Sequence, residues 1–172
     1  AIFGATAGWQ LCLSSTGLIR FEEKGTGTQA ESTTSILDTD WHHLVVTVNT
    51  SNLVSYYLDG ALLDTDTYDQ DIAAGQTWYI GQNGADGGYF GGIIDEVSVY
   101  STDLSLAEVQ ELYNDGIPLD ANTHSKAGYI QGYWRNNNLT TGGKWKDIAN
   151  VENLSLTASS SHYADITNIG GI

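Results

Sequence analysis

The stretch "NLVSYYLDGALLDTDT", residues 52–67, places the strongest constraint on the fold, because it specifies a β-hairpin by itself. Asp59-Gly60 is a residue pair that favours the tight type I′ turn, in which both residues take positive φ. Apolar and polar residues alternate in the flanking segments, Val54 to Leu58 and Ala61 to Asp66. The stretch therefore predicts two antiparallel strands joined by a tight turn.

Composition extends this expectation to the rest of the chain. Its 172 residues include 10 tyrosines, 5 tryptophans, 20 glycines and 1 proline, spread among short Val/Ile/Leu stretches. Such a chain favours many short strands joined by Gly/Asn/Asp turns, and it is long enough for one domain with a sizeable core. We therefore expect an all-β domain followed by a tail.

The net charge excludes some classes of partner. The chain has 21 acidic and 6 basic residues, a formal charge of −15, which repels nucleic acid and anionic membrane surfaces. No run of about 18 apolar residues occurs, so we expect no membrane insertion. The charge by itself favours solubility over an acidic binding face and does not identify a partner.

The paired histidines in "DTDWHHLVVTVN", residues 38–49, raise the question of a metal or catalytic site. The alternation after them predicts a strand with Leu44, Val46 and Val48 on one face. Neighbouring strand residues point to opposite faces, so His42 and His43 reach one ion only if the backbone leaves the extended form, and a third ligand is needed. We favour hydrogen-bonded or solvated histidines at the start of the strand over a metal site.

Several acidic residues could suggest calcium. The loop "DTDTYDQD", residues 64–71, lacks the glycine and glutamate of an EF-hand, so we favour a solvated acidic loop. The segment "GIIDEVSVY", from Gly92 to Tyr100, predicts a strand that places Asp95 on the same face as Ile93 and Val97. Asp95 is then either satisfied by backbone N–H groups or a calcium ligand, and a carboxylate on a core face needs such partners.

Aromatic residues supply the candidate ligand-binding positions. The glycine-rich loop from Gly81 to Gly92 lacks the signature of a phosphate cradle, and we expect a rim loop with Tyr89 and Phe90 at its tip. Trp134 is a further candidate for stacking against a sugar. The remaining tryptophans that adjoin strands are expected in the core rather than at a ligand, as is the thiol of Cys12. These tryptophans are Trp9, Trp41 and Trp78.

One short helix is expected near residues 105–114. Ser105 and Glu108 form a capping box, and Leu104 and Val109 occupy the positions of a hydrophobic staple. Gly116 followed by Pro118 ends the helix. Its buried side makes this helix a structural element rather than a site.

Four segments together resemble a known family. They are "WHHLVVTVN", "YYLDGALL", "YIGQN" and "GGIIDEVSVYSTDLSLAEVQELYN". They resemble laminin-G-like domains of the concanavalin A-like lectin/glucanase superfamily, of the kind found in phage and marine bacterial surface proteins. The resemblance covers residues 1–117 and implies a jelly-roll sandwich of two antiparallel sheets, in which the paired histidines are structural. It also allows a structural calcium ion at Asp95, although no cofactor is required.

The sequence departs from that family at both ends. The initial strands expected before "AIFGATAGWQL" are absent. The sequence also starts at Ala1 and has no methionine, so we expect a cleavage product or a piece of a longer polypeptide. The Asn/Gly/Ser/Thr-rich tail, residues 118–172, contains two or three short strand-like islands. It resembles either the opening of such a domain or the tail of laminin-G-like proteins encoded by phages and marine bacteria. We expect the tail to dock on the sandwich or on a neighbouring chain, as an edge hairpin, a linker or the start of another module.

Catalysis is not expected. Glucanases of this superfamily carry a Glu-x-Asp-x-(x)-Glu strand, because glycoside hydrolysis needs two carboxylates facing one cleft. No such triplet occurs, and the adjacent pairs Glu22-Glu23 and Asp95-Glu96 point to opposite faces of a strand.

Two non-catalytic functions remain. We favour a surface-displayed structural or adhesion domain, a virion decoration or fibre component that could attach to host glycans. The alternative is a secreted carbohydrate-binding, lectin-like module of a bacterial cell-surface protein. In both cases we expect an extracellular or virion-surface location, with other protein chains or glycans as partners, and an oligomer or a larger assembly.

Overall fold

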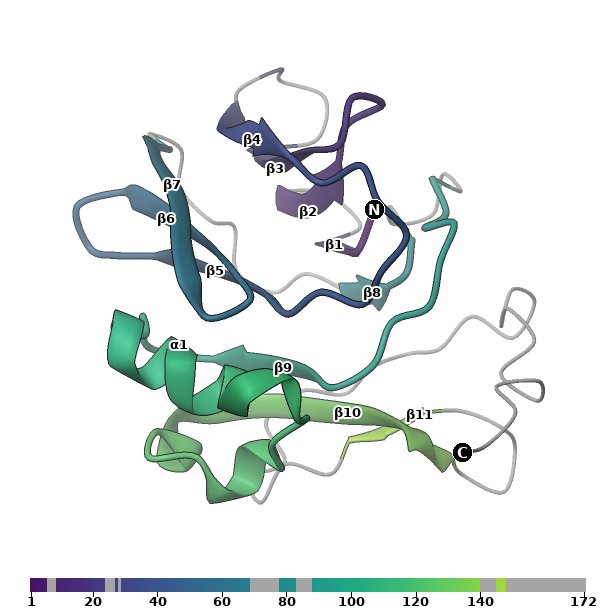
Figure 1. The fold of residues 1–172 in the computed structure, drawn as a ribbon, viewed down its shortest axis with the longest axis vertical. Coiled ribbons are helices and arrows are strands. Elements are labelled where there is room, and N and C mark those ends of the chain that lie inside the picture. The colour runs from purple at the N-terminus through teal and green to yellow at the C-terminus, as the bar shows by residue number, and fades with distance from the viewer. Residues whose placement is uncertain are drawn as a thin grey trace.

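The structure is a computed structural model that describes residues 1–5, 9–23, 27, 29–68, 78–82, 88–139 and 145–147. Its described part is built mainly of antiparallel strands with one short α-helix (Figure 1). The all-β prediction with a single short helix is confirmed. None of the helices in the described part is long and apolar enough to cross a membrane.

The first sheet has five strands in the order β4-β3-β2-β1-β8. Their bounds are β1 (Phe3–Ala5), β2 (Trp9–Leu13), β3 (Leu18–Glu23), β4 (Gln29–Ser35) and β8 (Trp78–Ile80). The turn between β2 and β3 contains Gly17 with φ +79°, a conformation that favours glycine.

The second sheet has three strands in the order β5-β6-β7. They are β5 (Leu44–Val48), β6 (Leu53–Leu58) and β7 (Ala61–Thr67). Asp59 and Gly60 connect β6 and β7 with φ values of 50° and 75°, so the predicted type I′ hairpin is confirmed.

The first and second sheets pack against each other around one apolar cluster. Ile19 and Phe21 of β3 meet Val54 and Tyr56 of β6 there, and all four are buried. Leu44, Val46 and Val48 join the cluster from β5, as the alternation predicts. These side chains form the inner layer of the β-sandwich.

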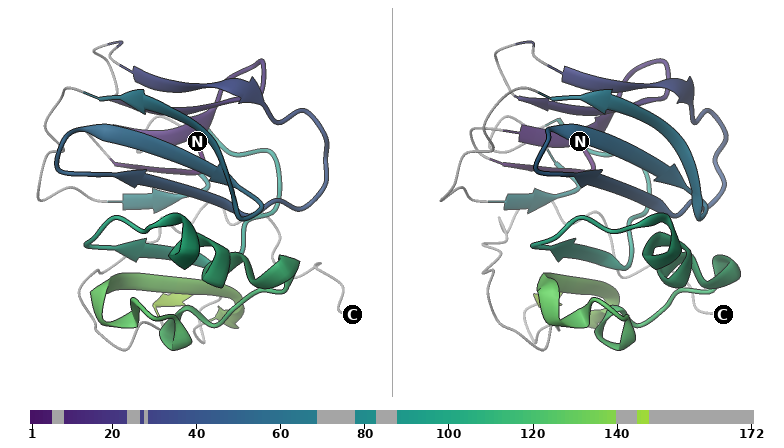
Figure 2. Two further views of the ribbon diagram at one scale, coloured as in Figure 1. Left: turned by 60° about the vertical axis from the view of Figure 1, so that its left-hand side comes forward. Right: turned by 90° about the vertical axis from the view of Figure 1, so that its left-hand side faces the viewer.

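The third sheet lies below the sandwich in Figures 1 and 2 and has the order β11-β10-β9. Its strands are β9 (Val97–Tyr100), β10 (Ile130–Leu139) and β11 (Trp145–Asp147). Strand β10 thus comes from the segment that follows residue 117, and it pairs with β9 in antiparallel fashion. The chain after β9 supplies the strand that covers one edge of β9.

The helix α1 (Leu106–Tyr113) follows β9 and begins with the predicted capping box. The Ser105 N–H donates to Glu108 Oε2 at 2.7 Å, and the Ser105 side chain accepts from the Glu108 N–H. The helix ends at Asn114, which takes the left-handed conformation, two residues before the predicted glycine. Three short 3₁₀ turns follow it: η2 (Asn114–Gly116), η3 (Ala121–Thr123) and η4 (Ala127–Tyr129).

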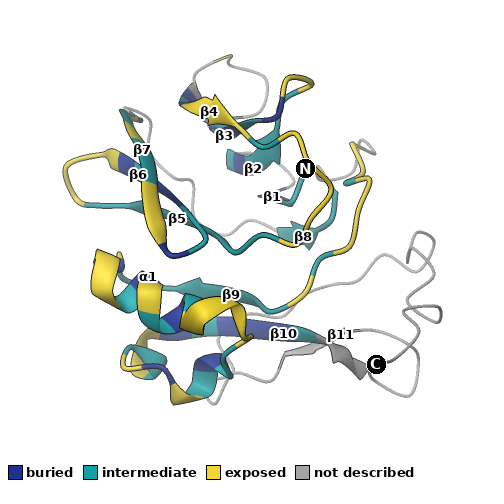
Figure 3. Cartoon of the chain, viewed as in Figure 1, coloured by how far each residue is buried: buried dark blue, intermediate teal, exposed yellow. Residues whose placement is uncertain are grey.

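A second apolar cluster joins the helix to both neighbouring sheets. Val109 and Leu112 of α1 contact buried Tyr57 of β6 on one side and Ile130 and Tyr133 of β10 on the other. Figure 3 shows that the buried part of this region lies along β10 and under α1, whereas the outer side of α1 is exposed. The helix therefore acts as a structural clip, as predicted.

Candidate functional site

The paired histidines are placed by a carboxylate in the β6–β7 turn. Asp59 accepts the His43 backbone N–H through Oδ1 at 2.9 Å, and its Oδ2 lies 2.8 Å from His42 Nδ1. On its other side the His42 ring contacts Asp38 Oδ1, at 2.7 Å from Nε2. The type I′ turn thus places a carboxylate where it fixes the entry to β5, and this agrees with the structural interpretation of both histidines.

The two rings have opposite electrostatic environments. Hydrogen bonds to Asp59 and then to Asp38 raise the pKa of His42 above its ordinary value of 6.5. Burial lowers the pKa of His43, whose ring lies 5.9 Å from the Tyr113 ring. Within the described ranges, no three His, Cys, Asp or Glu side chains form a group that could hold a metal ion.

Trp41 precedes these histidines and is exposed. Its side chain retains 64 % of its accessible surface, so the prediction that it belongs to the core is wrong. The reason is its position in the segment before β5, outside the strand alternation that packs Leu44 and Val46 against the apolar cluster. We call Trp41 together with Asp38, Asp40, His42 and Asp59 the β5-entry surface. It combines an exposed indole with carboxylates and a ring nitrogen that can hydrogen-bond.

The other tryptophans predicted to be structural lie in an aromatic group at the first sheet. Trp9 and Trp78 have ring centroids 4.5 Å apart. The Phe3 ring stacks on Trp78 at 5.4 Å, and Phe21 contacts Trp9 at 4.9 Å. Both tryptophans are only partly exposed, in agreement with a core role.

Tyr89 and Phe90 lie on the segment that leads from β8 toward β9. The Phe90 N–H donates to the Gly81 carbonyl at 2.8 Å, and the amino group of Ala1 donates to the Gly88 carbonyl at 2.7 Å. Tyr89 is 51 % exposed, whereas Phe90 is partly covered. The predicted positions are thus anchored at the surface by backbone bonds, and residues 83–87 of this loop lie outside the described residues. Part of the acidic loop, residues 69–71, also lies outside them.

Asp95 does not occupy the core face that its alternation with Ile93 and Val97 predicts. Strand β9 begins only at Val97, because Glu96 takes a positive φ of 53° and interrupts the extended backbone. Ile93 is 53 % exposed, and Asp95 is exposed and accepts the Glu96 N–H at 2.8 Å. The expectation that Asp95 lies on a core face is therefore wrong.

Glu96 is the carboxylate that turns inward at this point, and alternation alone would not reveal it. Its Oε1 accepts from Arg135 Nε at 2.6 Å, and its Oε2 accepts from the Tyr133 hydroxyl. Burial raises the pKa of Glu96 despite these two donors. The three side chains tie the start of β9 to β10, which is a structural role.

Trp134 is not at the surface. Its side chain is 0 % exposed, and its ring lies so close over Gly132 that a β-carbon would not fit there. The expectation of an exposed ring is wrong, because β10 is an inner strand between β9 and β11. As placed, Trp134 has no face available for stacking on a ligand.

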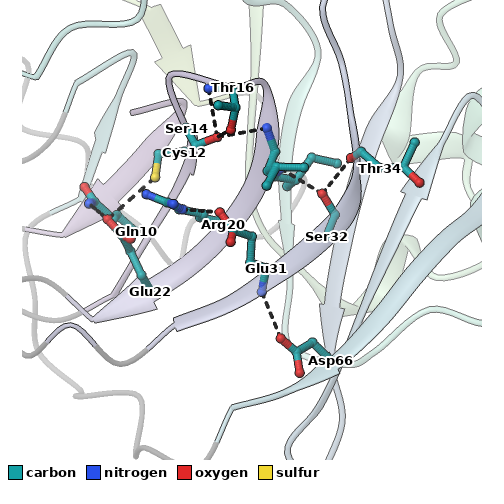
Figure 4. A network of polar contacts seen from close by, with 12 residues as sticks. Gln10, Cys12, Ser14, Thr16, Arg20, Glu22, Glu31, Ser32, Thr34 and Asp66 are labelled. Atoms are coloured by element: carbon teal, nitrogen blue, oxygen red, sulfur yellow. Dashed lines mark hydrogen bonds and ion pairs between the residues drawn. The ribbon is translucent and has the colours of Figure 1, made fainter.

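The carboxylates of the first sheet hold neighbouring strands together. Figure 4 shows Arg20 bonded to Glu31, and Gln10 Nε2 donating to Glu22. Cys12 Sγ lies 3.7 Å from Glu22 Oε1, and burial together with this carboxylate raises the pKa of the thiol to about 11. Such a thiol stays protonated near neutral pH and does not act as a nucleophile.

Comparison with known protein families matches residues 1–110 to the concanavalin A-like lectin/glucanase superfamily, in its laminin-G type. A search of curated proteins finds no match.

One solved structure shows the same fold over most of this chain. The chain superimposes on a candidate carbohydrate-binding protein from Bacteroides ovatus ATCC 8483 with a TM-score of 0.67 and 18 % identity. The match covers 86 % of this chain and 44 % of the other, so the chain spans less than half of that protein. An S-layer domain-containing protein from Clostridium thermocellum ATCC 27405 matches with a TM-score of 0.38 and 21 % identity, over 63 % of this chain and 57 % of the other. The family match covers most of the chain, and the sandwich architecture agrees with it. The chain is therefore a laminin-G-like member of the concanavalin A-like lectin/glucanase superfamily.

Proposed function

We propose that this chain is a non-catalytic carbohydrate-binding domain displayed outside the cell or on a virion. Two lines support a glycan ligand. The superfamily contains lectins, and the structural neighbour from Bacteroides ovatus is described as a candidate carbohydrate-binding protein. Because one fold serves many functions, the proposal rests mainly on a surface of the chain itself.

The observation that carries the proposal is the exposure of Trp41 on the β5-entry surface. An exposed indole offers a flat apolar face on which the C–H face of a sugar ring can stack. Asp38 and Asp40 are exposed beside it in the sequence, and their carboxylates can accept hydrogen bonds from sugar hydroxyls. His42 holds Asp38 at 2.7 Å, so one of these acceptors is already oriented in the free protein.

Tyr89 and Phe90 form a second candidate position within the same proposal. The half-exposed Tyr89 ring lies on a segment whose backbone is anchored to Gly81, so it offers a second aromatic surface for a sugar. We also retain calcium at Asp95 as a proposal, because its exposed carboxylate is accessible to an ion.

The absence of catalysis is part of the proposal. Three carboxylates already have a side-chain partner from another segment: Glu22 accepts from Gln10, Glu31 from Arg20 and Glu96 from Arg135. A retaining or inverting hydrolase would need two carboxylates free to face a sugar across one cleft.

We propose, more specifically, that the domain is a structural or adhesion component of a virion, such as a decoration or fibre protein. Among the described strands, β5 and β9 each lie at the edge of a sheet, and open edges favour assembly with other protein chains. Glycan attachment is compatible with this assignment.

A glycan array with calcium, and again with EDTA, tests the proposal. We expect saturable binding that falls roughly 2- to 13-fold in Trp41→Ala, because an aromatic stacking contact contributes about 0.5–1.5 kcal/mol. Tyr89→Ala and Phe90→Ala test the second position, and loss of binding in EDTA tests calcium.

Leu37→Ala is the matched control, because Leu37 is 73 % exposed but not aromatic. Equal losses in Trp41→Ala and Leu37→Ala would remove the β5-entry surface from the proposal. If the array shows no binding with calcium or with EDTA, the proposal of a glycan ligand is contradicted. A structural role in a virion would then remain as the proposed function.

A further inference from the structure

The segment between β4 and β5 is held by backbone bonds at its two ends and is exposed between them. The Ile36 N–H donates to the Gly17 carbonyl at 2.8 Å, and the Asp59 N–H donates to the His43 carbonyl at 2.9 Å. Between these two anchors, residues 37–41 are all exposed, so burial in the apolar core does not hold them. The exposed indole and two carboxylates of the β5-entry surface lie in this range, and their position therefore depends on side-chain bonds.

The ring of His42 supplies such a bond. Its Nε2 lies 2.7 Å from Asp38 Oδ1, and its Nδ1 lies 2.8 Å from Asp59 Oδ2. One carboxylate belongs to the exposed segment and the other to the β6–β7 turn, so the ring joins the two. The Asp40 N–H also donates to Asp38 Oδ1, at 3.0 Å, and the Asp38 side chain is 54 % exposed. A ligand hydroxyl can therefore reach the carboxylate that the ring holds.

Both contacts of the ring require that it is protonated on both nitrogens. Hydrogen bonds from His42 and from the Asp40 N–H lower the pKa of Asp38, so this carboxylate is ionised where a histidine titrates. An ionised carboxylate only accepts hydrogen bonds, whereas a neutral imidazole has one N–H donor and one lone pair. The imidazolium can donate to both carboxylates. In the neutral ring, one nitrogen directs its lone pair at a carboxylate oxygen, so one of the two contacts must open.

The contact that opens is the one to Asp38. The carboxylate of Asp59 is fixed, because Asp59 bonds the His43 backbone twice, through its own N–H and through Oδ1, at 2.9 Å each. Asp38 lies in the exposed range, and its further bond, from Asp40, is local. The neutral ring therefore keeps its proton on Nδ1, toward Asp59, and Nε2 releases Asp38.

We propose that protonated His42 is a positioning residue, which holds Asp38 and the segment that carries Trp41 against the β6–β7 turn, and that loss of the Nε2 proton to water releases this segment. As regulation of glycan binding, the inference rests on the proposed function. As a change in the free protein, it is measured without a ligand. Side chains that are ordered in advance lose less entropy on binding, so glycan binding should weaken as the pH rises and His42 loses its proton.

The titratable groups around the ring set the direction of this response. Asp59 and then Asp38 raise the pKa of His42 above 6.5, so the holding form persists to higher pH than in an isolated histidine. On the inner side, burial lowers the pKa of the neighbouring His43, which packs beside the Tyr113 ring of α1. His43 is thus neutral where His42 titrates and adds no positive charge that would oppose the holding form.

NMR on the full chain, without any glycan, tests the release. The probes are the ring nitrogens of His42 and the backbone amides of residues 38–41, followed from about pH 5 to about pH 9. We expect the imidazolium at low pH and the Nδ1–H tautomer at high pH. The motion of the four amides should increase with the same midpoint as the ring titration.

An array of neutral glycans, read over the same pH range, tests the consequence for binding. Uncharged glycans do not titrate, so a pH dependence belongs to the protein. We expect binding to weaken about 2- to 13-fold from the lowest to the highest pH, the range expected for one side chain that must be ordered on binding.

Two variants separate this mechanism from a general effect of charge. In Asp38→Asn the side chain can accept from the imidazolium or donate to the neutral ring, so the motion of residues 38–41 should no longer follow the His42 titration. Asp40→Asn is the matched control, because it removes the same charge from the same segment and keeps the backbone N–H that bonds Asp38. This control should retain the coupled transition.

Four results would overturn the proposal. The Nε2–H tautomer at high pH would mean that the ring keeps Asp38 and releases Asp59. Amide motion that does not change across the His42 titration would show that the ring does not hold the segment. Loss of the coupled transition in both variants would assign it to net charge. Glycan binding that does not change with pH would contradict the regulation.

Failure of the glycan ligand gives a different result. In that case the array is blank at every pH, while the Nδ1–H tautomer and the coupled amide motion are still observed. That combination would contradict the proposed function and support the release of the segment by His42.

Discussion

At the scale of single residues, the environment of each side chain decided roles that residue type left open. His42 and His43 are neighbours in sequence, yet one is held between two carboxylates and the other is buried beside Tyr113. The sequence alone indicated that they point to opposite faces. It could not indicate that Asp59, 17 residues away, bonds to His42.

The two histidines should titrate on opposite sides of 6.5, the ordinary pKa. His42 binds its proton more tightly when folded, so its contribution to stability is present below pH 6.5 and disappears as pH rises through its folded-state pKa. His43 is buried in its neutral form. Its contribution to stability is therefore present above pH 6.5 and disappears as the pH falls through its lowered pKa.

NMR titration of the ring protons checks both directions. In Asp59→Asn the pKa of His42 should fall toward 6.5, because Asp59 makes the hydrogen bond that raises this pKa most and the asparagine carries no charge. Asparagine tolerates the positive φ of 50° at this position, so the turn should persist. An unchanged His42 pKa in this variant would show that Asp59 does not hold the ring.

At the scale of elements, the hairpin and the helix were predictable because their signals are local. The Asp59-Gly60 pair and the capping box of Ser105 and Glu108 each act within a few residues. Strand β9 was predicted too long, since Glu96 takes a positive φ and its side chain bonds Arg135 and Tyr133 in a strand that follows much later. Local alternation carries no information about such partners.

Gly60→Ala should destabilise the β6–β7 hairpin. Gly60 has φ +75°, which costs an alanine about 1 kcal/mol or more, and its β-carbon would lie 2.7 Å from the Tyr113 ring. We expect a loss of roughly 2–3 kcal/mol in the free energy of unfolding, measured by urea denaturation.

Gly128→Ala is the matched control, because nothing lies within 4 Å of its added β-carbon. We expect a change within about 0.5 kcal/mol there. Similar losses in the two variants would contradict the contact between the hairpin turn and α1.

At the scale of the whole molecule, the sandwich and the third sheet depend on each other. Ile130 and Tyr133 of β10 are buried in the cluster that also contains Tyr57 of β6. The boundary at residue 117 was drawn from composition and resemblance, and it stays a prediction. Strand β10 lies beyond that boundary and still contributes to the core around α1.

A chain that ends at residue 117 should therefore lose cooperative folding. Each large apolar side chain removed from a buried position costs about 1.5–3 kcal/mol, so losing Ile130 and Tyr133 costs roughly 3–6 kcal/mol. Total stabilities are only about 5–15 kcal/mol. Thermal unfolding followed by circular dichroism checks this, with a chain ending at residue 150 as the control that keeps β10 and β11. A sharp transition in the shorter chain would contradict the prediction.

The sequence by itself determined the all-β class, the hairpin at Asp59-Gly60, the capped helix and the alternation of β5, because each depends on residues within one turn or one strand period. Only the tertiary structure decided that Trp41 is exposed, that Trp134 is covered over Gly132 and that Glu96 rather than Asp95 turns inward. Exposure and charge pairing depend on which distant strands meet. That choice is made by packing between sheets, which no local pattern encodes.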